Sequence, residues 1–464
     1  MRYRPAPLEI SAEQPFANDA LNLEPAADAL TQLISNGKGP GVIAVDASWG
    51  FGKSTFLEMW RKSYEAGGGK VVWWNAWEND FVEDVFVSLF EEIGDQITAA
   101  NPKARAAKGH AKQAAKSLLK HGVPMAIRIA TAGLLSGHEL EGKGLDQLLE
   151  SASSDYLDSY LERKQGIKKF REQLQKFVEE QAGDSGGDCL PIAIVVDELD
   201  RCRPAFALQA LETIKHLFGI NGLVFVLGLD LEQLGNAIQG AYGPHFDGKG
   251  YLRRLIDVKL GLPEPDIDKF VDALIMRYEI SETFSQRTRN WLSTPENLAT
   301  SLKRFAKLRA MSLRDVEQAM LQINLYLGSI RPGSILFPTL AACLIVMRQK
   351  DSGRYDHFFR LANDFDAAWA LLLAEFPGLE KTQDDSGQLL ELETRVVLGG
   401  VDLLDSRLIA LGKARTDSDS LSDYDSRLLE LGGHLRRMLN NFGVFSSSVS
   451  YIRARLDLLH VHER

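Results

Sequence analysis

GVIAVDASWGFGKST, residues 41–55, joins a short β-branched apolar run to a turn with two glycines and then to the start of an amphipathic segment. The apolar run, Gly41–Val45, has the length and composition of a buried strand. After the turn Ser48–Gly52, apolar residues recur at helical spacing from about Ser54 to Glu65. The predicted order is therefore strand, glycine turn, helix.

The turn matches the Walker A spacing G-x-x-x-x-G-K-[ST], with alanine in place of the first glycine. A loop that wraps phosphate groups must point successive backbone N–H groups inward, which glycine permits by tolerating positive φ. We expect Lys53 to contact the β- and γ-phosphates, with a catalytic role, and Ser54 to ligate Mg²⁺. The position between a strand and a helix favours this interpretation over an incidental turn. The predicted cofactor-binding residues are Ala47, Ser48, Trp49, Gly50, Phe51, Gly52, Lys53, Ser54 and Thr55.

A second motif, PIAIVVDELDR at residues 191–201, places two carboxylates directly after a fully apolar strand. Carboxyl ends of parallel strands meet the ligand crevice in open α/β sheets. The pattern predicts that Asp197 holds Mg²⁺ and that Glu198 orients or deprotonates the attacking water. The alternative, a strand that ends in a charged turn, is less favoured because a Walker A motif accompanies it.

Four further residues are candidates for contact with the γ-phosphate. Asp230 follows the strand Leu223–Leu229 and is either a polar sensor or a plain helix N-cap. Arg253 and Arg254 are candidates for a charge-stabilising guanidinium, with pairing to Asp257 as the alternative. Arg314 is predicted to lean onto the nucleotide from a helical lid, or else to be an ordinary surface arginine.

Strand and helix patterns alternate along the first half of the chain. This alternation predicts an α/β fold, a P-loop NTPase core with a parallel sheet covered by helices, followed by a mainly helical lid and C-terminal lobe. The further expected strands are Lys70–Asn75, Ile192–Val196, Leu223–Leu229 and Val258–Leu262, and the expected helices between them are Val82–Ile97, Pro204–Phe218 and Leu231–Ala241.

The same strand and helix patterns predict four regions. They are an N-terminal segment 1–37, the core 38–265 with an insertion at about 98–182, a helical lid 266–330 and a C-terminal helical domain 331–464.

Composition excludes several classes of protein. The chain has 45% hydrophobic and 25% charged residues, with a net charge of −10, so it is neither broadly basic nor apolar enough for a membrane protein. Its three cysteines, Cys189, Cys202 and Cys343, are far apart and lack metal-ligand spacing, which suits a reducing compartment. The N-terminus lacks the apolar core of a signal peptide. We therefore expect a cytoplasmic protein.

One stretch, Lys103–Lys120, is rich in alanine and lysine and carries no acidic residue. The favoured interpretation is a solvated helix face, and the alternative is contact with nucleic acid or with an acidic membrane surface. The apolar stretch that follows, Gly122–Gly137, is interrupted by Arg128 and is too short to cross a bilayer as a helix.

Three tryptophans, Trp73, Trp74 and Trp77, lie at and beyond the end of one expected strand. Because large aromatic side chains dominate burial, we expect core packing rather than a partner-binding surface.

Together these motifs resemble the KAP group of P-loop NTPases, which is related to the AAA+ and STAND ATPases. The resemblance rests on the residues at 49–54, 73–77, 197–202 and 251–254, and it covers about residues 16–330. It also implies that Asn18 and Asp19 belong to a segment that helps to seat the nucleotide base. Many relatives carry two transmembrane helices between the Walker motifs, and this chain has only the basic stretch and Gly122–Gly137 there.

What the resemblance implies is an ATPase that uses a catalytic glutamate and in which hydrolysis drives a conformational or assembly change. It further implies a bacterial protein, a homo-oligomer or a partner protein, and a role in defence against phages or plasmids. The alternatives are a small-molecule or nucleoside kinase, and a scaffold that holds nucleotide without turnover.

Overall fold

A computed structural model of the chain describes residues 4–37, 39–82, 190–215, 219–287, 294–330, 336–379, 384–417, 421–442 and 449–457, with scattered positions in 85–96 and 168–179. The chain divides into two compact units, each with its own core. The sheet unit comprises Ile10–Asp19 and Leu23–Pro263, and the helical unit comprises Met1–Glu9, Ala20–Asn22 and Glu264–Arg464.

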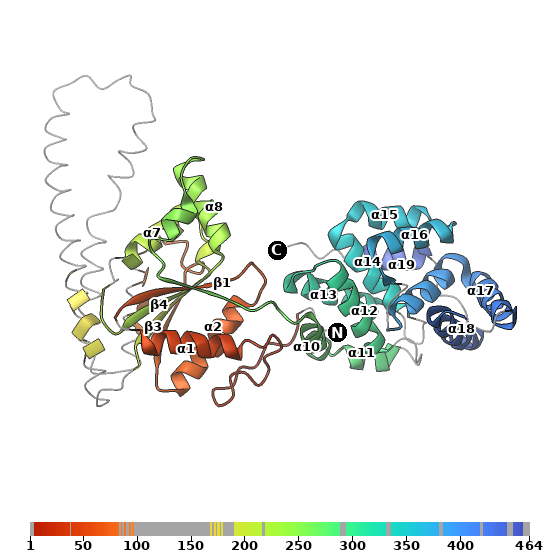
Figure 1. Cartoon of the computed structure of the whole chain (residues 1–464), viewed down its shortest axis with the longest axis horizontal. Helices are drawn as coiled ribbons and strands as arrows, with labels where there is room; N and C mark the ends of the chain where they lie inside the picture. The colour runs from red at the N-terminus through yellow and green to blue at the C-terminus, as the bar shows by residue number, and fades with distance from the viewer. Residues whose placement is uncertain are drawn as a thin grey trace, which may run out of the picture. The chain divides into compact units, whose positions relative to one another are not determined.

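The sheet unit contains five strands in the order β2-β3-β4-β1-β5, and every neighbouring pair is parallel (Figure 1). The strands are β1 (Gly41–Asp46), β2 (Lys70–Asn75), β3 (Ile192–Asp197), β4 (Leu223–Leu229) and β5 (Val258–Gly261). This sheet confirms the predicted α/β class. The expected strand at Val258–Leu262 ends one residue earlier than predicted.

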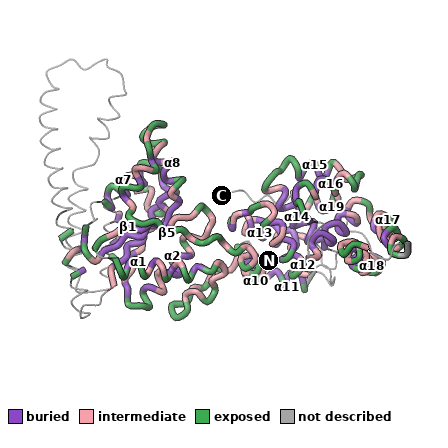
Figure 2. The backbone as a smooth tube through the Cα atoms, in the orientation of Figure 1, coloured by how far each residue is buried: buried purple, intermediate pink, exposed green. Residues whose placement is uncertain are grey.

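Helices cover both faces of the sheet, with α1 and α2 on one face and α7 and α8 on the other (Figure 1). Every residue of β3 and of β4 is buried, as strands packed on both faces require (Figure 2). The helices of this unit are α1 (Glu24–Asn36), α2 (Lys53–Ala66), η2 (Leu199–Arg201), α7 (Pro204–Lys215), α8 (Leu231–Tyr242) and α9 (Gly248–Leu252).

The tryptophans at the end of β2 separate into buried and exposed positions. Trp74 is fully buried and its ring stacks with that of Phe206, as predicted. Trp77 is 53% exposed, so the expectation that it packs in the core is wrong. The strand ends at Asn75, and Trp77 lies in the turn beyond, where the alternation of the strand no longer applies.

Between the two Walker motifs, residues 97–167 and 180–189 lie outside the described residues. The basic stretch Lys103–Lys120, the segment Gly122–Gly137 and Cys189 therefore lie outside them, and only parts of the expected helix Val82–Ile97 lie inside.

The helical unit is built around one continuous apolar cluster that includes residues from α10 to α19. Its helices are α10 (Ile267–Arg277), α11 (Ile280–Arg287), α12 (Pro295–Leu308), α13 (Leu313–Ser329), α14 (Pro338–Lys350), α15 (Ser352–Arg360), α16 (Phe365–Glu375), α17 (Ser386–Asp417), α18 (Asp423–Phe442) and α19 (Val449–Asp457). The predicted lid and the predicted C-terminal domain share this unit and its core.

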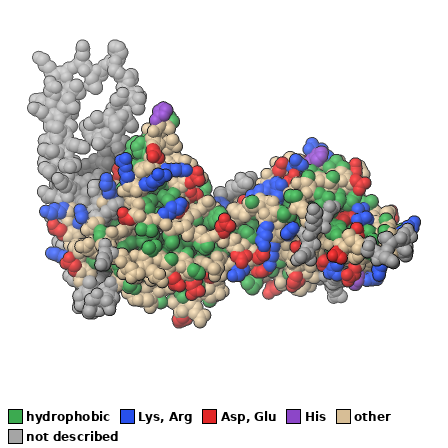
Figure 3. Space-filling view, in the orientation of Figure 1, with side chains coloured by type: hydrophobic (Ala, Val, Ile, Leu, Met, Phe, Trp, Pro, Cys, Tyr) green, Lys and Arg blue, Asp and Glu red, His purple; other side chains and the backbone are tan. Residues whose placement is uncertain are grey.

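On the face of the helical unit seen in Figure 3, cationic and anionic side chains are interspersed. Among the helices that the structure describes, none is both long enough and apolar enough to span a bilayer.

Candidate functional site

The first part of the site is the turn between β1 and α2. Gly50 and Gly52 have φ values of 82° and 79°, a backbone region that strains residues with a Cβ atom. Gly52 is the N-cap of α2, whose first residue is Lys53. The glycines therefore let the turn lead directly into the N-terminus of a helix, where unpaired N–H groups and the helix dipole favour an anion.

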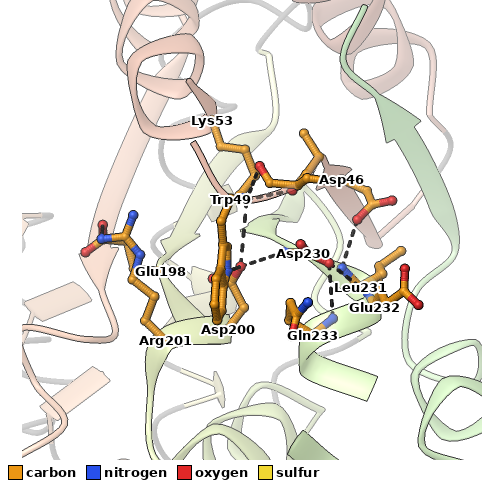
Figure 4. Close-up of polar contacts among 12 residues, drawn as sticks. Asp46, Trp49, Lys53, Glu198, Asp200, Arg201, Asp230, Leu231, Glu232 and Gln233 are labelled. Carbon is orange, nitrogen blue, oxygen red and sulfur yellow. Dashed lines mark hydrogen bonds and ion pairs between the residues drawn. The ribbon is translucent and has the colours of Figure 1, made fainter. Parts of the chain in front are cut away.

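The ammonium group of Lys53 lies against this turn (Figure 4). Its Nζ atom donates to the carbonyl of Ala47 at 2.6 Å and lies 3.7 Å from Oδ2 of Asp200. The side chain is only 10% exposed. A lysine held in this way has its charge beside the loop that the sequence assigns to phosphate.

The second part is the end of β3. Asp197 is 3% exposed, and the hydroxyl of Ser54 lies close enough to its carboxylate to influence its pKa. Burial raises the pKa of Asp197 to about 6, the Ser54 hydroxyl opposes this rise, and the charge of Glu198 adds to it. A hydroxyl and a carboxylate are oxygen donors of the kind that Mg²⁺ prefers, so the predicted metal pair fits that ion.

Gly228 of β4 makes room for this carboxylate. It lies opposite Asp197 in the strand register, and a Cβ atom built on it would be 2.9 Å from Oδ1 of Asp197 and 2.4 Å from Cδ1 of Leu57. The sequence analysis missed this residue. A glycine inside an otherwise continuous apolar strand was the available signal, since it often marks a close approach.

Glu198 is held by its neighbours at both carboxylate oxygens. Arg201 Nη1 lies 2.6 Å from Oε1, and Asn75 Nδ2 donates to Oε2 at 3.2 Å. The backbone of Glu198 has a φ of 60°, a strained conformation that is concentrated at functional sites. Asn75 was not predicted as a site residue, although it ends β2 opposite Asp197.

Asp200 is a further residue that the sequence analysis quoted within a motif but gave no role. Its Oδ2 atom accepts hydrogen bonds from Trp49 Nε1 and from the backbone N–H of Asp230, each at 2.8 Å (Figure 4). Together with Lys53, these contacts bring the turn, the end of β3 and the end of β4 to one carboxylate.

Asp230 caps α8 in the structure. Its Oδ1 atom accepts from the backbone N–H groups of Glu232 and Gln233, at 3.0 and 3.1 Å. This is the alternative that the sequence left open, and the sensor role stays a prediction. Beside it, Asp46 Oδ1 accepts from the N–H of Leu231.

A cavity of about 530 Å³ adjoins the turn. Asp230, Arg253 and Ser48 of the turn all line this cavity. Arg253 and Arg254 are exposed, and neither pairs with Asp257 among the described contacts. Asp257 Oδ2 accepts from the N–H of Val42. The cavity is lined by Asp46, Ala47, Ser48, Asp230, Leu231, Glu232, Lys249, Leu252, Arg253, Ile256, Asp257 and Lys259.

The remaining predicted residues are Asn18, Asp19 and Arg314. Asp19 accepts from the N–H groups of Leu23 and Glu24 and so caps α1. Its role with Asn18 in seating a base stays a prediction. Arg314 is the second residue of α13 in the helical unit, and its role likewise stays a prediction.

In this parallel sheet a glycine turn leads from β1 into α2, and acidic residues lie at the carboxyl end of β3. This combination defines a P-loop NTPase. The model of the "KAP family P-loop domain" matches residues 23–326, and the chain therefore belongs to the KAP family. The resemblance seen in the sequence is thereby confirmed, and nucleotide binding follows as the property of the class.

Several solved structures are similar over much of the chain. The Aeropyrum pernix ORC2 protein, in ADPNP–ADP complexes, is 14% identical, with 82% of each chain covered and a TM-score of 0.35. Cdc6p from Pyrobaculum aerophilum is 12% identical, with 81% of this chain and 83% of that chain covered and a TM-score of 0.36. PCH-2 from C. elegans is 9% identical, with 73% of this chain and 67% of that chain covered and a TM-score of 0.30. No curated protein matches the chain.

Proposed function

We propose that the chain binds ATP with Mg²⁺ and hydrolyses it. The observation that carries this proposal is the convergence of the phosphate-binding turn with the end of β3, where Ser54 lies close to Asp197 and Lys53 and Trp49 contact Asp200. Membership of the KAP family supports the nucleotide. Because the side chains come from segments far apart in the sequence, their convergence is not a by-product of local structure.

The backbone N–H groups from Ala47 to Thr55 would bind the phosphates, and Lys53 would leave its loop carbonyl to contact the β- and γ-phosphates. Ser54 and Asp197 would hold Mg²⁺, which when bound neutralises charge on the phosphate oxygens. Glu198 would orient the attacking water or accept its proton, for which one carboxylate oxygen must leave Arg201 or Asn75.

Two substitutions test this proposal. Lys53→Ala should abolish nucleotide binding in calorimetry, because the loop loses its cation. Glu198→Gln should retain binding and stop phosphate release, because the amide cannot accept a proton. Unchanged turnover in both variants would reject the site.

Beyond hydrolysis, we propose a conformational or assembly switch. Asp230 would sense the γ-phosphate, and Arg253, Arg254 or Arg314 would supply a guanidinium to it, within one chain or between copies of a homo-oligomer. The same proposal includes a partner protein and a contact of residues 103–120 with nucleic acid or a membrane. It also includes a cytoplasmic location and a bacterial role in defence against phages or plasmids. Particle size measured with and without ATP tests assembly, and an unchanged size would leave only a change of shape.

The kinase alternative is favoured by one feature, the cavity of about 530 Å³ beside the turn, which offers room for an acceptor. Transfer of labelled phosphate to an added alcohol or nucleoside, in place of release to water, would distinguish a kinase from an ATPase.

A further inference from the structure

One carboxylate oxygen connects three segments of the site. Oδ2 of Asp200 accepts from the indole of Trp49 in the turn and from the N–H of Asp230 at the start of α8, and it lies 3.7 Å from the ammonium of Lys53. Figure 4 shows Asp200 between Trp49 and Asp230. The side chain of Asp200 is 2% exposed, so water does not compete for these contacts.

The contact with Lys53 differs in kind from the other two. An ammonium group that is only 10% exposed needs a counter-charge, and Asp200 supplies one. Triphosphate would offer the same ammonium a stronger partner. The two N–H groups, in contrast, are not phosphate ligands in this arrangement and stay available to Asp200.

The surroundings of Asp200 make this balance sensitive to charge. The carboxylate is close enough to Asp197 to raise the pKa of that acid, and Glu198 acts in the same direction. Glu198 has Arg201 as its cation, whereas Asp200 has Lys53. When phosphate takes Lys53, Asp200 loses its cation and depends more strongly on the donors from Trp49 and Asp230.

We propose that Asp200 is a positioning residue that holds Lys53 in line with the acids of β3 and transmits occupation of the phosphate site to Trp49 and to the start of α8. This inference rests on the proposed function and adds to it a route from the phosphates to two elements outside the turn. Trp49 is 45% exposed, so a change at the turn can be followed by the fluorescence of its indole.

The test replaces Asp200 by asparagine, which keeps the shape and removes the charge. Turnover of ATP is measured by phosphate release and divided by the number of binding sites found in calorimetry, so that loss of folded protein does not count as loss of activity. We expect kcat to fall on the order of 100-fold, as misplacement of a catalytic group does, with the KM for ATP changed only a few-fold.

The emission of Trp49 gives the second readout. It is obtained as the difference between the full-length protein and its Trp49→Phe variant, with Mg·ADP and with a non-hydrolysable ATP analogue. We expect this emission to respond to nucleotide in the wild type and to lose that response in Asp200→Asn. Asp80→Asn is the matched control, since Asp80 pairs with Arg203 and none of the contacts described for it involves Lys53 or Trp49. It should keep the response.

The outcomes separate the two proposals. A wild type that binds no nucleotide would overturn both. A wild type that binds and hydrolyses ATP, with an Asp200→Asn variant that keeps its kcat or its Trp49 response, would overturn this inference alone. If Asp200→Asn does not fold, Trp49→Phe decides by itself: a fall in kcat of about tenfold, the loss of one hydrogen bond to a charged group, supports the inference, and an unchanged kcat overturns it.

Discussion

The hydroxyl of Ser54 lies close enough to the carboxylate of Asp197 to influence its pKa, although 143 positions separate the two residues in the chain. Ser54 is the second residue of α2, and Asp197 is the last residue of β3. The two strands that precede these residues are not neighbours, because β4 lies between β1 and β3. The start of α2 and the end of β3 therefore lie side by side.

The raised pKa of Asp197 predicts a stabilising substitution. Its folded-state pKa of about 6 exceeds the usual value of 3.8, so the folded protein binds this proton more tightly than the unfolded chain. The stability from this group is present below about pH 4 and is lost as the pH rises through 6. Asp197→Asn should therefore stabilise the protein at pH 7 by about 3 kcal/mol, in the absence of nucleotide and Mg²⁺.

Urea denaturation of both proteins at pH 4.5 and at pH 7 would check this prediction. The gain should be larger at pH 7 than at pH 4.5, and the same variant should lose Mg²⁺-dependent turnover. A variant that is less stable at pH 7 than the wild type would contradict the interpretation that the buried, charged carboxylate of Asp197 destabilises the folded protein.

Gly228 predicts a local steric effect. A methyl group at this position would press on Asp197 and on Leu57, so Gly228→Ala should destabilise the protein by about 1–3 kcal/mol and displace the acid. Gly240 of α8 has nothing within 4 Å of an added Cβ atom. Gly240→Ala is therefore the matched control and should be neutral or stabilising by about 0.5–1 kcal/mol.

Thermal melting and phosphate release of the two variants would check this expectation. Equal melting temperatures for Gly228→Ala and Gly240→Ala would show that β4 can move away from Asp197.

The restraint of Glu198 predicts a gain of activity. Arg201 holds Oε1 of Glu198 and also lies over the exposed ring of Trp77. Arg201→Gln would free that oxygen for the attacking water, and we expect kcat to rise a few-fold, the equivalent of about 1 kcal/mol. Arg203→Gln is the control, because Arg203 is equally cationic and pairs with Asp80 instead. A fall in kcat for Arg201→Gln alone would mean that Arg201 places Glu198 for catalysis.

The parts of the site that follow from local pattern were predictable from the sequence. The turn, Lys53 and Ser54 form one continuous motif, and Asp197 and Glu198 directly follow an apolar strand. The same patterns indicated the strands of the sheet.

Asn75, Asp200 and Gly228 could not be assigned in this way, because their roles depend on which strands are neighbours. Asn75 and Gly228 lie opposite Asp197 from either side only because β3 lies between β2 and β4. Asp200 gains its role from contacts with Trp49 and Asp230, which a linear motif does not contain. Trp77 was placed wrongly because the general preference of large aromatic side chains for burial does not hold in the exposed turn beyond β2.

In the helical unit, Glu393 of α17 caps a helix from outside. Its Oε2 atom accepts from the N–H of Leu340 at 2.7 Å, at the start of α14, whose own N-cap residue Phe337 supplies no side-chain hydrogen bond. Burial raises the pKa of Glu393 to about 8, although hydrogen bonds from Leu340 and Thr339 oppose the rise.

This pKa predicts a loss of stability with rising pH. Because the folded-state value exceeds the ordinary value of 4.5, the contribution of Glu393 is fully present below about pH 4.5 and is lost as the pH rises through 8, in total on the order of 4 kcal/mol. Glu393→Gln should remove this dependence, so that its advantage over the wild type grows between pH 5 and pH 8. Glu391→Gln is the contrasting control, since Glu391 is buried and pairs with Arg395 and Arg407, of which Arg407 also pairs with Asp425. Denaturant titrations at four values of pH would separate the cases, and a parallel pH dependence in Glu393→Gln and the wild type would show that Glu393 is charged at neutral pH.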